Sequence, residues 1–325
     1  MTFPLRSQKG PERMRAIVAR TTKLTPLKAV ATKAIQMAQD ERTRAMDLAA
    51  VISADQALTA KILRLSNSPY YGYARRISTV REAVILLGMR TVRSVAVSSA
   101  IIDAFKLPEF VGEFSTDLFW AHSVTVGLVA ELVAKETKAC RPEDAFTAGV
   151  LHDIGKLATM VADPETFAEL IEIVSRDGVR FRDAELAVFG LTHAEIGAEL
   201  VEGWRFPDAL VAAIRDHHPA GPLVRLSSLT DVVAAANLAC HLAGYDCGFD
   251  NTRLPERREA LTLPAEVDRA LARVPHGMAG VSEKARAFLV NVTSRPPRWY
   301  AMPGEATPAA EAAEDQDIKT DRAVA

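Results

Sequence analysis

The chain of 325 residues has few of the features that mark secreted, membrane-spanning or β-rich proteins. None of its apolar runs reaches the roughly 18 residues that a transmembrane helix needs. The first ten residues lack the apolar core of a secretory signal. Only three cysteines occur, none of them in a CxxC motif, which fits a reducing compartment. The sequence therefore predicts a cytoplasmic protein that does not span a membrane.

Alternation of apolar and polar residues is nearly absent, whereas apolar residues repeat at helical spacing along most of the chain. Asp55 is a good N-cap, Thr79 and Glu82 form a capping-box pattern, and Gly88 is placed to end a helix. These signals predict an all-α fold. Helices are expected at 26–40, at 43–53, after Asp55, and at 80–87, 90–105, 116–137, 142–161, 164–177, 181–190, 193–204, 207–217, 227–243, 264–274 and 282–292.

Pro108 separates two helical parts, and the last residues differ from both in composition. Beyond Ser294, prolines, alanines and acids without apolar periodicity predict a disordered tail. We expect an N-terminal helical subdomain packed on a second helical bundle. The predicted divisions are 1–19 (extension), 20–110 and 111–245 (the two halves of one domain), 246–293 (C-terminal helical extension) and 294–325 (tail).

Charge is distributed unevenly between these parts. Residues 1–110 hold 18 Lys and Arg against 8 Asp and Glu, and the remainder holds 21 against 33. The two halves could attract each other, or the basic half could bind nucleic acid. The basic residues are scattered, and the helix expected after Gly88 is too apolar to read DNA bases. Nucleic-acid binding is therefore the less favoured interpretation.

One segment combines buried character with reactive side chains. Residues 145–157 are expected to form a buried helix that contains His152, Asp153 and Lys156. Burying a charge is costly unless it is paired or binds a metal ion, and an imidazole beside a carboxylate suits a divalent cation. Lys156 follows His152 by four residues, so it could lie on the same side and contact a phosphate.

Other histidines could complete such a site. His122, His193, His217 and His218 fall within or at the ends of expected helices, and a bundle core could bring them together. A metal ion held by His122, His152, Asp153 and one more oxygen donor would leave positions for water, as in hydrolytic sites. His241 and His276 lack such neighbours and are expected to be incidental. Cys240, His241 and Cys247 could be read as a metal cluster, but their spacing matches no common zinc pattern.

Two long segments of the first half, 58–72 (LTAKILRLSNSPYYG) and 77–90 (ISTVREAVILLGMR), resemble the HDOD domain, an HD-related output domain of bacterial signalling proteins. The second half resembles the HD superfamily of metal-dependent phosphohydrolases. That resemblance implies metal ligands at His122, His152 and Asp153. The surroundings of His193 and of His217–His218 are similar to additional ligands of the HD-GYP branch, which degrades cyclic di-nucleotides. The HDOD resemblance extends from about residue 20 to 245.

The sequence departs from the HD pattern at two places. Asn237 occupies the position where the pattern has its closing aspartate, and Asp231 lies nearly two turns upstream, where it should face elsewhere. An amide oxygen carries no charge, so metal affinity and water activation should both weaken. The chain after His218 reads Pro-Ala-Gly-Pro instead of the Gly-Tyr-Pro loop of the HD-GYP branch. Both departures argue against hydrolysis.

The resemblance implies a regulatory protein that binds signalling partners or a small nucleotide, with a degenerate metal site and no confident catalytic residue. The alternative is a surviving phosphohydrolase that acts on a nucleotide or cyclic di-nucleotide. The cofactor would be a divalent iron, manganese or magnesium ion, with His122, His152, Asp153, His193, His217, His218 and the degenerate position Asn237 as candidate ligands. A third reading has His152 and Asp153 bonded to each other and to backbone without metal. The oligomeric state cannot be predicted.

Overall fold

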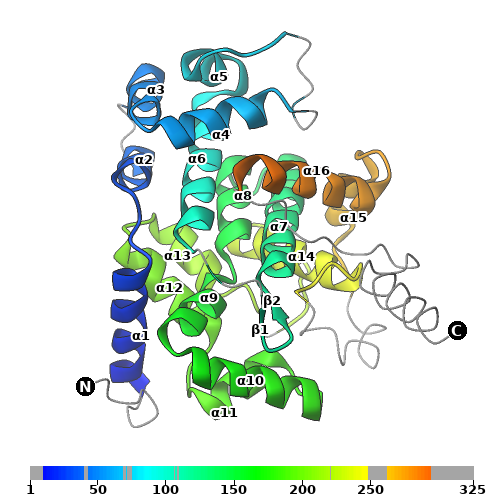
Figure 1. The fold of residues 1–325 in the computed structure, drawn as a ribbon. Coiled ribbons are helices and arrows are strands. Elements are labelled where there is room, and N and C mark those ends of the chain that lie inside the picture. Colours follow the sequence, from blue (N-terminus) through cyan, green and yellow to red (C-terminus); the bar gives the residue numbers. More distant parts are fainter. Residues whose placement is uncertain are drawn as a thin grey trace, which may run out of the picture.

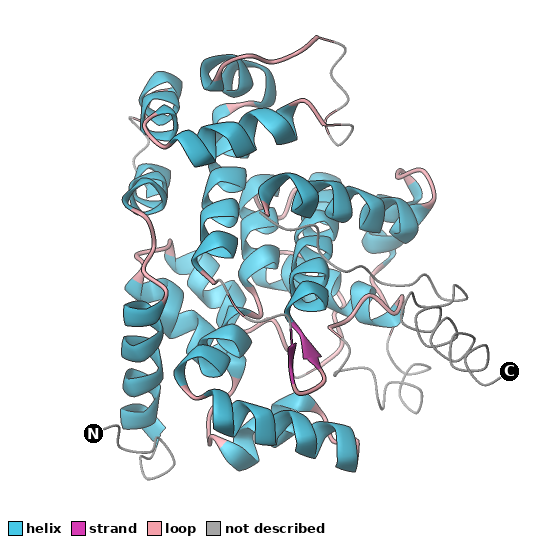
Figure 2. Cartoon of the chain, viewed as in Figure 1, coloured by secondary structure: helices cyan, strands magenta, loops and turns pink. Residues whose placement is uncertain are grey.

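The computed structural model describes residues 10–39, 43–68, 71, 75–105, 107, 110–219, 221–247 and 262–293. Within these residues the chain is helical apart from one short hairpin (Figure 2), so the predicted all-α class is confirmed. The elements are α1 Gly10–Leu24, α2 Ala29–Gln39, α3 Ala45–Ser53, α4 Gln56–Ser66, α5 Val80–Leu87, α6 Met89–Ala104, β1 Phe110–Val111, β2 Phe114–Ser115, α7 Thr116–Thr137, α8 Pro142–Leu151, α9 Ile154–Ala162, α10 Pro164–Asp177, α11 Phe181–Val188, α12 His193–Gly203, α13 Asp208–Arg215, α14 Leu229–Leu242, α15 Ala265–Ala272 and α16 Gly277–Val292.

Helices α2 to α6 form an N-terminal lobe at the top of Figure 1. The predicted caps are present: Asp55 accepts a hydrogen bond from the backbone of Leu58, and Thr79 and Glu82 form the capping box of α5. Gly88 has a φ of +90°, a conformation that glycine adopts without a Cβ penalty, and α6 leaves α5 at this residue with a bend of 120°. Local sequence signals therefore place the helices of this lobe well.

The second bundle is built around α7, which packs against α8, α14, α15 and α16 (Figure 1). Ser115, at the end of the hairpin, caps α7 by accepting a hydrogen bond from the backbone of Leu118. Among the described helices, α7 alone is long and apolar enough by itself to cross a membrane, but 83 % of its apolar window is buried inside the protein. Its hydrophobicity is therefore explained by its place in the core.

Helix α1 was not expected from the sequence, which predicted an extension over residues 1–19. It packs against α9 and α12 of the second bundle (Figure 1) and away from α3 to α5. The Thr21 hydroxyl donates to the Ala158 carbonyl at 3.0 Å. The buried Arg13 guanidinium donates to the carbonyls of Val188 and Phe189. The described part of the chain thus starts against the second bundle with α1, continues through the N-terminal lobe and returns to the second bundle with α7.

The prediction of one continuous helix over 142–161 is wrong. The chain forms α8 and α9 with a break at His152 and Asp153, where Asp153 has φ −100° and ψ 8°. The Lys156 amide donates to the Asp153 carbonyl in a tighter, i to i+3 turn. The break lies between two buried helices, so periodicity alone could not reveal it. Most of loop 69–74 and the whole tail 294–325 lie outside the described residues.

Candidate metal centre

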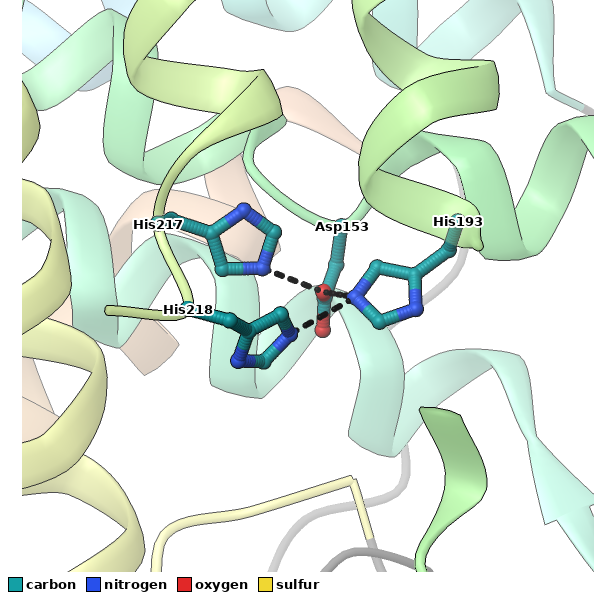
Figure 3. A group of neighbouring side chains, drawn as sticks. All are labelled: Asp153, His193, His217 and His218. Carbon is teal, nitrogen blue, oxygen red and sulfur yellow. Dashed lines mark hydrogen bonds and ion pairs between the residues drawn. The ribbon is translucent and has the colours of Figure 1, made fainter. Parts of the chain in front are cut away.

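The two carboxylate oxygens of Asp153 are surrounded by histidines from four parts of the bundle. Nε2 of His193 lies 3.1 Å from Oδ1 of Asp153, and Nε2 of His217 lies 3.5 Å from it. On the other oxygen, Oδ2, the corresponding distances are 3.4 Å to His152 and 3.8 Å to His122. The rings of His193, His217 and His218 point toward Asp153 in Figure 3. The predicted convergence of these histidines is therefore seen.

Close contacts between glycines allow the supporting helices to approach one another. A Cβ on Gly155 of α9 would lie 1.9 Å from the carbonyl oxygen of His193, and one on Gly149 of α8 would lie 2.6 Å from Cα of Gly127 of α7. Side chains at these positions would separate α9 from α12 and α8 from α7. The glycines therefore set the spacing that brings the histidines to Asp153.

Each of the four histidines is oriented by a partner at its Nδ1 atom. His122 bonds the Tyr245 carbonyl, His152 that of Gly149 and His217 that of Ile214, each at 2.7 Å. His193 bonds Oε2 of Glu185 at 2.6 Å. Because carbonyl and carboxylate oxygens only accept hydrogen bonds, Nδ1 carries the proton in each ring and Nε2 is left to face Asp153. Metal-binding histidines show this arrangement almost without exception.

Three buried nitrogen atoms of the cluster make no hydrogen bond within the described part of the chain: Nε2 of His122, His152 and His217. An unpaired buried donor or acceptor costs about 1–3 kcal/mol. Here the Nε2 lone pairs face a carboxylate that can only accept hydrogen bonds, so the carboxylate cannot satisfy them. A cation among them would do so. The residues present therefore fit a divalent metal ion.

The candidate ligands form two groups that share Asp153. One consists of His122, His152 and Asp153, and the other of Asp153, His193, His217 and His218, with ligand atoms within 4.8 Å of one another in each group. We call these the first and the second group. In the second, Nε2 of His193 lies 2.9 Å from Nε2 of His218, which is only partly buried. Any access from solvent is therefore on the side of the second group.

The charges at the site follow from its burial. Burial alone would raise the pKa of Asp153, but its electrostatic interactions with His152, Lys156 and His193 hold it well below its usual value. Burial alone would lower the pKa of His193, but the charges of Glu185 and Asp153 outweigh it and raise the pKa to about 9. Burial lowers the pKa of His217 to about 4. Without a metal ion, His193 is thus protonated and His217 is neutral at pH 7.

Lys156 was predicted to contact a phosphate. Its side chain is 1 % exposed, and its Nζ donates to Oδ2 of Asp153 at 2.8 Å. The ammonium group also lies 4.9 Å from the centre of the Phe181 ring. Lys156 therefore belongs to the centre as the cation that neutralises Asp153 on the side of the first group.

Asn237 is buried on α14, which packs on α7 and α8, and its Oδ1 makes no hydrogen bond within the described residues. His241 follows it by one turn, and its ring lies 5.1 Å from that of His122, so Asn237 lies on the helix face that points toward the first group. His241 therefore has a close neighbour that the sequence did not reveal. Asp231 forms the capping box of α14 with Ser228, away from the site as expected.

Two supporting residues escaped the sequence reasoning: Glu185, eight residues before His193, and Tyr245, whose carbonyl orients His122. A buried Glu on an otherwise apolar helix face was the only available signal for Glu185. Cys240 and Cys247 belong to neither ligand group of the described residues, although Sγ of Cys247 lies 3.8 Å from Nζ of Lys156. Among the described residues, Cys240, His241 and Cys247 therefore do not form a set of metal ligands.

Comparison with known proteins identifies the architecture. Residues 24–220 match the model of the HDOD domain family. The chain belongs to the HDOD domain family. A HDOD domain protein of unknown function from Geobacter sulfurreducens superposes with a TM-score of 0.66 at 26 % identity, covering 86 % of this chain and 96 % of that one. A provisionally assigned phosphohydrolase from Shewanella amazonensis gives 0.63 at 27 % identity, covering 83 % and 98 %.

A similar sequence is found in an uncharacterized protein of Treponema pallidum, which is 30 % identical over 195 residues. The match covers 59 % of this HDOD chain and 37 % of that protein, so the chain spans little more than a third of that relative's length. The two solved neighbours share the helical fold of this chain. The family-model match begins at residue 24, the last residue of α1, so nearly all of α1 lies before the matched segment.

Proposed function

We propose that this HDOD protein is a regulatory protein whose HD-derived centre binds a divalent metal ion as a structural element, and that it acts by binding partners without catalysis. The observation that supports this is the combination of unpartnered ligand atoms with their burial. His122, His152 and His217 are at most 1 % exposed, as is Asp153. A metal ion there would tie the α8–α9 break, α12 and the segment after α13 together.

The donor set favours iron over magnesium. Imidazole nitrogens suit first-row transition metals, whereas magnesium prefers oxygen ligands and retains its waters. The ligands would be those of the second group, with His122, His152 and Asn237 on the other side of Asp153. When bound, such an ion could lower the pKa of a coordinated water. Asn237, which supplies no charge, weakens both binding and that chemistry.

The partners are proposed to be signalling proteins or a small nucleotide. Two large apolar side chains on α5 of the N-terminal lobe, Ile85 and Leu86, are 65 % and 45 % exposed. Neighbouring exposed apolar residues are common at contact surfaces. A photo-crosslinking residue at position 85 should therefore capture a defined protein in cells. The same residue at the exposed position 199 on α12 should not capture it.

Metal analysis of protein purified without chelators, paired with a phosphodiesterase screen, tests the main proposal. We expect near-stoichiometric iron or manganese, a lower melting temperature after chelation and no turnover of phosphodiesters with added Mn²⁺ or Fe²⁺. A content below about 0.1 metal ion per chain, with a melting temperature that added metal does not change, would contradict the structural metal.

A metal-dependent phosphohydrolase is the second candidate. Two ligand groups that share one carboxylate resemble the pairing of ions in two-metal hydrolases, where one ion activates water and both stabilise the phosphate oxygens. The structural neighbour from Shewanella amazonensis carries a phosphohydrolase assignment. Turnover of a cyclic di-nucleotide that disappears in His152→Ala and Asp153→Ala would establish this function and exclude the non-catalytic one.

A further inference from the structure

We infer that Glu185 is a positioning residue that prepares His193 for metal binding and makes the second group (Asp153, His193, His217 and His218) the preferred metal position. The inference rests on the metal centre proposed above and adds to it the residue that selects the position. Glu185 lies on α11, outside both ligand groups. We expect it to act through His193 and not to contact the metal ion.

Glu185 holds His193 at two points. Its side chain is 3 % exposed, and Oε2 accepts a hydrogen bond from the His193 backbone amide at 3.0 Å and another from Nδ1 at 2.6 Å. Two bonds from one oxygen fix both the start of α12 and the orientation of the ring. As a result, Nε2 of His193 is directed at Oδ1 of Asp153, 3.1 Å away.

The partner of His193 differs in kind from those of the other histidines. Nδ1 of His122, His152 and His217 bonds a neutral backbone carbonyl. An anionic partner makes the imidazole a stronger electron donor to a metal at its other nitrogen. Among these four rings, His193 is thus the one with the greatest intrinsic metal affinity.

Helix α11 is short, with eight residues, and is anchored from both sides. At its end, Arg13 of α1 donates to the carbonyls of Val188 and Phe189 at 3.0 and 3.1 Å, with its guanidinium 4.7 Å from the centre of the Phe189 ring. At its start, Phe181 packs one turn before Glu185 and places its ring 6.0 Å from that of His193. These contacts keep the carboxylate of Glu185 fixed.

The histidines of the first group have no carboxylate partner at Nδ1. The Lys156 ammonium donates to Oδ2 of Asp153, the oxygen that faces His122 and His152, so a second cation placed there would be repelled. Asn237 adds no negative charge to offset that repulsion. A single metal ion is therefore expected to bind on the side of His193, with Lys156 remaining on the other side of the carboxylate.

Co²⁺ binding to the full chain tests the inference, because the visible absorption of Co²⁺ reports its coordination as well as its affinity. Glu185→Gln keeps the size and an acceptor oxygen but removes the charge. We expect at least a roughly tenfold loss of Co²⁺ affinity and an altered absorption band, while the far-ultraviolet circular dichroism of the metal-free protein stays that of the wild type. His217→Ala should abolish binding, and His122→Ala should retain it.

Glu195→Gln is the matched control. Glu195 lies on the same helix as His193, and its Oε2 accepts bonds from the backbone amide and hydroxyl of Thr192, both at 2.8 Å. This variant should bind Co²⁺ like the wild type. Equal losses of Co²⁺ affinity in both variants would mean that Glu185 acts only as a cap of α12, which would overturn the inference. If Glu185→Gln does not fold, Glu185→Asp, which keeps the charge at a greater distance, should show an intermediate affinity.

Co²⁺ binding distinguishes a failure of the proposed role of Glu185 from a failure of the proposed metal centre. Unchanged Co²⁺ affinity in Glu185→Gln, with binding intact in the wild type, would overturn the role of Glu185 alone. Binding that is lost in His122→Ala and kept in His217→Ala would place the metal ion in the first group and also overturn it. A wild-type chain that binds no Co²⁺ would overturn the metal centre, and the inference with it.

Discussion

Each half of the molecule contains a buried lysine paired with a carboxylate, and the two pairs have different surroundings. In the N-terminal lobe, Nζ of Lys61 on α4 donates to Oδ1 of Asp103 on α6 at 2.5 Å, and burial lowers the pKa of Lys61. In the second bundle, Lys156 and Asp153 form a similar pair at 2.8 Å. Four histidines crowd only the second, and three of them leave Nε2 without a hydrogen bond within the described residues.

The difference separates a structural ion pair from a binding site. A buried pair that satisfies itself serves packing, because each charge is compensated by the other. A buried pair surrounded by lone pairs without hydrogen bonds lowers the stability of the folded protein, and a bound cation would remove that destabilisation. The following experiments test this difference between the two pairs, starting with the largest expected effect.

Asp153→Ala should destabilise the metal-free protein by about 3–5 kcal/mol, because it leaves Lys156 buried without its carboxylate. It should also abolish metal binding. Asp103→Ala removes the partner of Lys61 in the same way and should destabilise the protein while metal binding is retained. Urea unfolding and metal analysis of the two variants check this. Retention of metal by Asp153→Ala would contradict the assignment of the centre.

The metal-free protein should lose stability on both sides of about pH 6.5. The pKa of His193 is raised to about 9, so its contribution is complete below its unfolded value near 6.5 and is lost as the pH rises through 9, by at most about 3 kcal/mol. The pKa of His217 is lowered to about 4, so its contribution is lost as the pH falls from 6.5 through 4.

Urea unfolding in chelator at pH 6.5 and 9 measures the alkaline limb. His193→Gln should flatten that limb, and His276→Gln, at an exposed position, should leave it unchanged. Bound metal should also flatten it, because the metal ion takes the place of the His193 proton. An alkaline limb that persists in His193→Gln would show that another group is responsible.

Gly155→Ala should destabilise the protein by about 1–3 kcal/mol and weaken metal binding, because its Cβ would meet the His193 carbonyl oxygen at 1.9 Å. Gly203→Ala, where a Cβ would meet nothing within 4 Å, should be neutral or stabilising by up to about 1 kcal/mol. Thermal unfolding and Co²⁺ titration test both. Equal behaviour of the two variants would show that the close approach of α9 and α12 is unimportant.

Asn237→Asp should give the smallest effect, a rise of about tenfold in metal affinity, since it adds one negative charge beside the first group. Asp231→Asn on the same helix should leave the affinity unchanged and cost about 1 kcal/mol through the weaker cap of α14. Chelator competition measures both affinities. If Asn237→Asp leaves the affinity unchanged, a charge at residue 237 does not act on the metal ion.

Much of the fold follows from local patterns in the sequence. The caps at Asp55 and Thr79 and the turn at Gly88 depend on residues a few positions apart, so the helices of the N-terminal lobe were predicted well. The α8–α9 break was missed because residues 145–160 on both sides of it are all buried, so no amphipathic change marks it. Helix α1 was missed because polar and charged residues dominate it and its docking depends on distant residues such as Ala158 and Phe189.

The sequence by itself determined the all-α class, the family and the identities of the metal-ligand candidates, because these follow from residue types at short, regular spacing. Only the tertiary structure decided which oxygen of Asp153 faces which histidine, where Lys156 is paired, and that Glu185 supports His193. Those relations depend on hydrogen bonds and close helix contacts between segments that are separate along the chain. Spacing in the sequence carries no information about which of the possible partners meet.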